Sequence, residues 1–105
     1  MSWTTHGGAG DALPISDSTF RPTRDSHLTH KTVMSPGPNP KHSMEAVYAK
    51  GSWDLHRGSQ GGFSFYAPGP SHVDLTLAKE ATFGYSVMFE EGYDWNRGGK
   101  LPGFC

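Results

Sequence analysis

The sequence has a single cysteine, no long hydrophobic run and no segment typical of a secretion signal. Because Cys105, the last residue, is the only cysteine, it cannot form a disulfide within the chain or build a thiolate metal site. No stretch approaches the roughly 18 apolar residues that a membrane-spanning helix needs. The first ten residues lack both a basic region and an apolar region, which excludes a signal peptide there.

The charges are balanced, which bears on the class of partner. Nine Lys and Arg residues stand against ten Asp and Glu residues, giving a formal net charge of −1. Proteins that bind nucleic acid through phosphate contacts usually carry a basic surplus. The sequence therefore predicts no nucleic-acid partner and no membrane partner, and it leaves the oligomeric state open.

The 105 residues suffice for one domain at most, and their composition is uneven. Residues 1–43 are rich in Gly, Pro, Ser, Thr and His, and the run Ser35–Pro40 cannot form a helix or a central strand. Ten of the thirteen aromatic residues lie between Trp53 and Phe104. We therefore expect a loop-rich lead-in over 1–43, with at most an edge strand, and a β-rich domain over 44–105.

Alternating apolar residues predict strands in the second part. Between residues 81 and 90 one face would carry apolar side chains and the other mostly polar ones, a period of two. Shorter stretches of the same kind predict strands near 44–50 and 62–67. The fold class is accordingly predicted to be all-β. Three or four strands are few for a sandwich, which normally has about seven, so we expect an incomplete domain.

Two candidate sites fail on inspection. Gly98-Gly99-Lys100 resembles part of a phosphate-binding loop, but the glycine and the Ser/Thr that this motif requires are Asp94 and Leu101 here. His27 and His30 could share a metal only on a helix, which the neighbouring residues do not favour, so we interpret both as solvated loop residues. No metal site and no cofactor is predicted. Glu90 and Glu91 are adjacent, and this neither indicates nor excludes a pair of catalytic carboxylates.

The segment from Phe89 to Gly103 is the most distinctive part of the chain. It places Tyr93, Arg97 and Lys100 in a glycine-rich turn that follows a predicted strand. Glycines allow a ligand to approach the backbone closely, and the two cations could pair with carboxylates of an acidic substrate. On composition alone, a hairpin turn with solvated charges is the favoured interpretation.

At this turn the sequence resembles polysaccharide lyase family 14, particularly its fungal members. The resemblance rests on Gly-Gly-Lys-Leu-Pro-Gly at 98–103 after Tyr-Ser-Val-Met-Phe-Glu-Glu-Gly at 85–92. Further similarity lies at 50–52, 61–66, 78–83, 12–17 and 21–23, so that it covers roughly residues 10–105. Glucuronan lyases of a neighbouring family share the turn, so the uronate polymer, alginate or polyglucuronate, stays open.

This resemblance implies a partial β-jelly roll and an extracellular enzyme that cleaves an acidic polysaccharide, rich in uronate, by β-elimination. Such a lyase must neutralise the uronate carboxylate, remove the C5 proton and protonate the leaving oxygen O4. By position, Lys100 matches the family's functional lysine and is the predicted catalytic residue. Arg97 and Tyr93 are weaker candidates for substrate binding.

The chain departs from the family pattern after this turn. The family's Ser-x-Arg and Tyr-x-Tyr pairs would follow it, and the sequence ends at Cys105 before either. We therefore expect an N-terminal fragment of a lyase domain that does not catalyse by itself. Two alternatives stay open: a non-catalytic module that binds acidic polysaccharide, and a truncated gene product without function.

Overall fold

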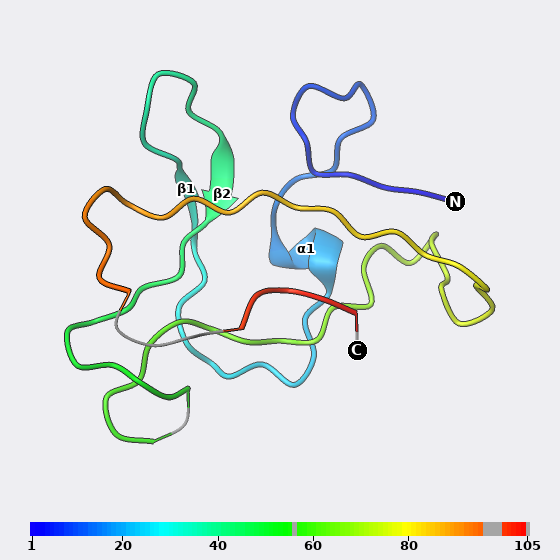
Figure 1. The fold of residues 1–105 in the computed structure, drawn as a ribbon. Helices are drawn as coiled ribbons and strands as arrows, with labels where there is room; N and C mark the ends of the chain where they lie inside the picture. The colour runs from blue at the N-terminus through cyan, green and yellow to red at the C-terminus, as the bar shows by residue number, and fades with distance from the viewer. Residues whose placement is uncertain (56, 96–99, 105) are drawn as a thin grey trace. The chain divides into compact units, whose positions relative to one another are not determined.

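The structure is a computed structural model that describes residues 1–55, 57–95 and 100–104. The chain divides into two compact units, unit 1 over Met1–Asp74 and unit 2 over Leu75–Cys105. All named secondary structure lies in unit 1: α1 (Asp17–Phe20), β1 (Thr32–Met34) and β2 (His42–Met44), which Figure 1 labels. The described residues are otherwise mostly turns and coil, so the fold is of a sparse β type.

The strands β1 and β2 form an antiparallel hairpin, in which Thr32 faces Met44 and Met34 faces His42. The same register continues beyond both ends, because Ser35 N–H donates to the Lys41 carbonyl at 2.8 Å and Glu45 N–H donates to the Lys31 carbonyl at 3.0 Å. The proline-rich run predicted to be neither helix nor central strand forms the connection between the two strands (Figure 1). Proline lacks an N–H, which suits it to a loop rather than a sheet.

A half-buried aromatic cluster forms the interior of unit 1. Trp3 lies edge-on to Phe20, with ring centroids 5.7 Å apart, and Phe20 lies 6.2 Å from Phe65. Phe63 stacks on Phe65 at 5.7 Å. Among the described hydrophobic residues only Val73 is buried, at 7 % exposed, so this core excludes water only in part.

Backbone hydrogen bonds hold two distant segments against this cluster. Thr23 and Tyr66 exchange two hydrogen bonds of 2.7 Å as an isolated antiparallel bridge. Ser26 N–H donates to the Ser64 carbonyl at 2.8 Å. The chain from 23 to 26 therefore pairs with the chain from 64 to 66, which brings Phe63 and Phe65 to the cluster.

The helix α1 is one turn long, and its boundaries have local causes. Its N-cap, Ser16, is extended and its side chain makes no capping hydrogen bond. Arg21 ends the helix in the left-handed region at φ 53°, where its N–H donates to the Asp17 carbonyl at 2.8 Å. A helix of this length has little stability of its own and depends on tertiary contacts. One of these contacts buries Thr19, which is 5 % exposed.

Unit 2 contains no helix or strand among its described residues. The prediction of a strand over 81–90 is therefore wrong, and every residue of this segment is exposed. The alternation of apolar residues is real, but a strand also requires a partner whose N–H and C=O groups continue the ladder. The described residues provide no such partner for this segment.

The two shorter predicted strands are also corrected. Of the stretch predicted over 44–50, only Met44 belongs to a strand, the end of β2. The stretch predicted over 62–67 contributes one bridge residue, Tyr66, rather than a strand. Half-buried and exposed residues alternate over 63–66, and the prolines at 68 and 70 end that stretch. Over 44–50 they do not alternate, because Met44 and Glu45 are half-buried and 46–50 are exposed.

None of the helices in the described part of the chain is both long and apolar enough to cross a membrane.

Gly62 provides a test of the packing in unit 1. It is buried, its φ is 74°, and a Cβ there would come within 2.9 Å of Tyr48 Oη. We expect Gly62→Ala to lower the free energy of unfolding by about 1–3 kcal/mol, because it adds both backbone strain and a steric overlap. Chemical denaturation monitored by circular dichroism would measure this.

Gly10→Ala is the matched control for this substitution. A Cβ at Gly10 meets nothing within 4 Å, and its φ is not positive. This variant should unfold within about 0.5 kcal/mol of the wild type. Equal unfolding free energies for both alanine variants would contradict the packing described here.

Candidate functional site

The turn predicted to carry the site begins at Glu90. Tyr93 N–H donates to the Glu90 carbonyl at 3.1 Å, and Gly92 has φ 76°. A positive φ at the third residue of a hydrogen-bonded turn is typical of a type II turn, where glycine is favoured. Glycine at position 92 is thus required by the backbone rather than by a ligand.

Three aromatic rings gather around this turn. The ring centroid of Trp95 lies 4.4 Å from that of Phe89 and 4.9 Å from that of Tyr93, and Phe89 and Tyr93 are 5.2 Å apart. Tyr93 is half-buried, whereas Trp95 is 65 % exposed. We call Phe89, Tyr93 and Trp95 the aromatic platform. Of these three residues, the sequence analysis named only Tyr93 as a candidate site residue, and the structure groups it with Phe89 and Trp95.

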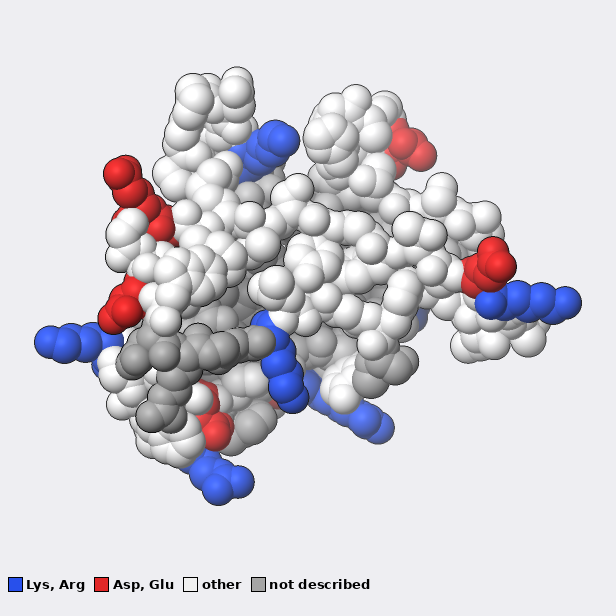
Figure 2. Space-filling view, viewed as in Figure 1, with Lys and Arg blue, Asp and Glu red and all other residues white. Residues whose placement is uncertain are grey.

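The predicted catalytic residue, Lys100, has an exposed side chain. Within the described residues it forms no ion pair and no hydrogen bond. Arg97, predicted to bind substrate, lies outside the described residues. In Figure 2 the Lys and Arg side chains project from the surface, as expected for cations that are not engaged in buried ion pairs.

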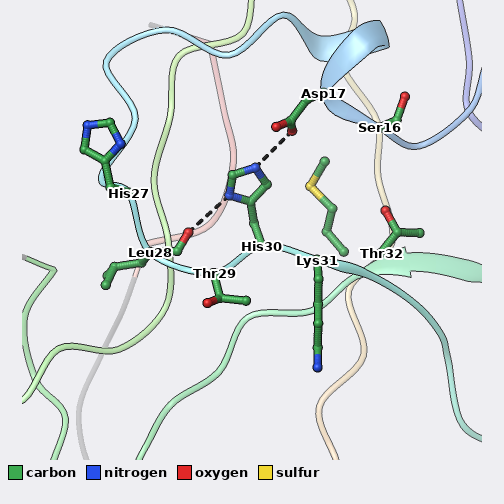
Figure 3. Close-up of a pocket in the computed structure, with 9 residues that line it drawn as sticks. Ser16, Asp17, His27, Leu28, Thr29, His30, Lys31 and Thr32 are labelled. Carbon is green, nitrogen blue, oxygen red and sulfur yellow. Dashed lines mark hydrogen bonds and ion pairs between the residues drawn. The ribbon is translucent and has the colours of Figure 1, made fainter.

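A second arrangement, in unit 1, was missed from the sequence. Figure 3 shows His30 at the centre of a shallow hollow, with Asp17 on one side and Leu28 on the other. His30 Nε2 lies 2.9 Å from Asp17 Oδ1, and Nδ1 lies 3.2 Å from the Leu28 carbonyl oxygen. Only the protonated imidazole can donate to both acceptors at once.

The aromatic cluster of unit 1 includes this imidazole. The ring centroid of His30 lies 5.1 Å from that of Phe65 and 5.4 Å from that of Phe63. Its side chain is 14 % exposed. The interpretation of His30 as a solvated loop residue is therefore wrong, because the ring is held by two phenylalanines and two hydrogen bonds.

Two opposing effects determine the pKa of His30. Burial disfavours the charged ring and lowers the pKa, but the hydrogen bonds to Asp17 and to the Leu28 carbonyl raise it. The negative charges of Asp17 and Asp25 raise it further, and the net result is a pKa above 6.5. The protonated ring is therefore stabilised by folding.

His27 does not share a site with His30. It lies in the left-handed region at φ 62°, its N–H donates to Asp25 Oδ1 at 2.8 Å, and its side chain is exposed. In Figure 3 its ring lies apart from that of His30. Within the described residues, no group of three or more His, Cys, Asp or Glu side chains is placed to hold a metal ion.

The contact between His30 and Asp17 predicts a pH dependence of stability. A raised pKa contributes stability that is fully present below pH 6.5 and is lost as the pH rises through the folded-state pKa. In the wild type we expect the free energy of unfolding to fall between about pH 5.5 and about pH 8.5, and we expect a smaller fall in Asp17→Asn. The effect should stay below about 1 kcal/mol, because the Asp17 side chain is 63 % exposed.

Denaturant titrations at the two pH values would measure this, with Asp11→Asn as the matched control. Asp11 is exposed and is not a partner of His30, so the unfolding free energy of this variant should change with pH as it does in the wild type. A steeper loss in Asp17→Asn than in the wild type would contradict the assignment.

Comparisons with known proteins place the chain in a family. The sequence profile of polysaccharide lyase 14 matches residues 37–105, which include the platform, the glycine-rich turn and Lys100. No curated protein and no solved structure matches the chain. The match confirms the resemblance inferred from the sequence and covers about two thirds of the chain, so this chain belongs to the polysaccharide lyase 14 family.

Proposed function

We propose that this chain serves the β-elimination of an acidic uronate polysaccharide, either alginate or polyglucuronate. One observation carries the proposal: the family match extends over residues 37–105 and includes the turn that holds Lys100. Extracellular localisation belongs to the same proposal, since such polymers are found outside cells. So does a partial β-jelly roll over residues 44–105 behind a loop-rich lead-in over 1–43.

The chemistry of β-elimination sets the roles of the residues. The proton at C5 of a uronate is removed more readily when a cation neutralises the adjacent carboxylate. A base then takes this proton, the bond between C4 and O4 breaks, and an acid protonates the departing oxygen. No water is added, and the new chain end carries a double bond between C4 and C5.

Lys100 is the residue that we propose for a direct role in this reaction. Its ammonium can neutralise the uronate carboxylate, and its amine can exchange a proton with the sugar. Exposure of the side chain, and the lack of an ion-pair partner among the described residues, are compatible with either role. We propose Arg97 and Tyr93 as substrate-binding residues, Arg97 through a bidentate pair with a carboxylate.

Binding without turnover is the second candidate function. The observation that favours it is the exposure of Trp95 beside two further rings, in a part of the chain where the described residues pair no acid or base with Lys100. A single lysine cannot supply all three tasks of the elimination. This candidate predicts retention on a polyuronate matrix with no release of unsaturated product.

Lys100→Ala in the natural protein that carries this sequence tests the enzymatic role. We expect the rate of elimination on polyglucuronate or alginate to fall by about 10²-fold or more if Lys100 transfers a proton. The unsaturated product absorbs in the near ultraviolet, so the reaction can be followed directly. Lys79→Ala is the matched control, because Lys79 is another exposed lysine of unit 2. Full activity of Lys100→Ala would remove Lys100 from the mechanism.

Lys100→Arg separates the two roles open to this residue. Arginine keeps the positive charge but does not give up its proton in proteins. If Lys100 transfers a proton, we expect kcat to fall about as far as in Lys100→Ala. If Lys100 only neutralises the uronate carboxylate, the arginine variant should keep most of its kcat. The alanine variant should still lose kcat, because the C5 proton is then removed less readily.

A further inference from the structure

The aromatic platform presents a ring face that no neighbouring aromatic ring covers by stacking. Trp95 meets Phe89 at an interplanar angle of 58° and Tyr93 at 66°, so both rings are inclined to the indole rather than parallel to it. Trp95 nevertheless remains 65 % exposed. An indole held in this way keeps much of its surface available to a ligand.

The platform is held in place by local structure. The turn from Glu90 to Tyr93 is closed by a backbone hydrogen bond of 3.1 Å, and this brings Tyr93 within 5.2 Å of Phe89. Trp95 then packs against both rings. A ligand that binds here meets aromatic groups that are already partly ordered, which lowers the entropic cost of binding.

We propose that Phe89, Tyr93 and Trp95 form a subsite on which the apolar face of a sugar ring stacks against Trp95. The inference rests on the proposed function in that it takes the ligand to be a polysaccharide. A pyranose ring exposes C–H groups on one face. Contact between this face and the indole removes apolar surface from water, which favours binding. This contact needs no charge on the sugar.

The charges beside the platform restrict how a uronate can lie on it. Glu90, Glu91 and Asp94 are exposed and are neighbours in sequence of the three rings. Three carboxylates repel the carboxylate of a uronate, an effect that salt screens. The subsite therefore favours a sugar that contacts Trp95 through its C–H face, with its own carboxylate directed away from these residues.

Titration calorimetry of the full chain with short polyglucuronate and alginate fragments tests the subsite, with a neutral glucan fragment as the second ligand. We expect Trp95→Ala to weaken binding of the uronate fragments about tenfold, equally at low and high salt. Trp95→Phe should lose less affinity for the uronate fragments than Trp95→Ala, because it keeps an aromatic face. Asp94→Asn should strengthen uronate binding about two- to threefold at low salt only, and should leave glucan binding unchanged.

Trp53→Ala is the matched control, because Trp53 is 63 % exposed but lies in unit 1. If the Trp53 and Trp95 alanine variants bind uronate fragments as the wild type does, the subsite is overturned and the proposed function stands. If Trp95→Ala weakens binding but the wild type prefers glucan, the subsite stands and the uronate substrate is overturned. If the wild type binds neither ligand, both proposals fail for this chain.

Discussion

The imidazole of His30 lies between two phenylalanines and hydrogen-bonds at both nitrogens, and unit 1 depends on this packing. The contacts of His30 come from three segments. Asp17 belongs to α1, the Leu28 carbonyl belongs to the segment before β1, and Phe63 and Phe65 belong to a segment more than 30 residues away. A polar ring is tolerated in this half-buried position because both of its nitrogens have acceptors. A unit with so few buried side chains gains much of its order from such specific contacts.

Unit 2 contrasts with this arrangement. Its aromatic residues form two groups, Phe83 with Tyr85 and Phe104, and the platform at 89–95, and all of them except the half-buried Tyr93 are exposed. Both groups are made by residues close in sequence, with Phe104 the exception, so they need little tertiary structure. Aromatic side chains that remain exposed are available for contact with another molecule. Unit 1 also exposes Trp53 at 63 %, so the proposed subsite in unit 2 rests on the grouping of three rings at one turn and not on exposure alone.

The chemistry of a lyase needs groups from several elements, because the cation, the base and the acid must surround one sugar ring. In the proposed role, Lys100 meets one of these needs. The platform adds a different kind of contact, which depends on apolar surface and not on charge. If both proposals hold, they supply one cation and one stacking group, and further proton-transfer groups would have to be added for turnover.

The sequence by itself determined the family, since the glycine-rich turn and the strand-like segment before it are matched by the profile over residues 37–105. It also determined the loop at Ser35–Pro40, because proline cannot donate to a ladder. Only the tertiary structure decided the positions of the strands and the role of His30. The alternation at 81–90 says which side chains could share a face, but whether a strand forms depends on a partner that no local pattern reveals. His30 looked solvated because Asp17, Phe63 and Phe65 are distant in sequence, and only the folded chain brings their carboxylate and rings around it.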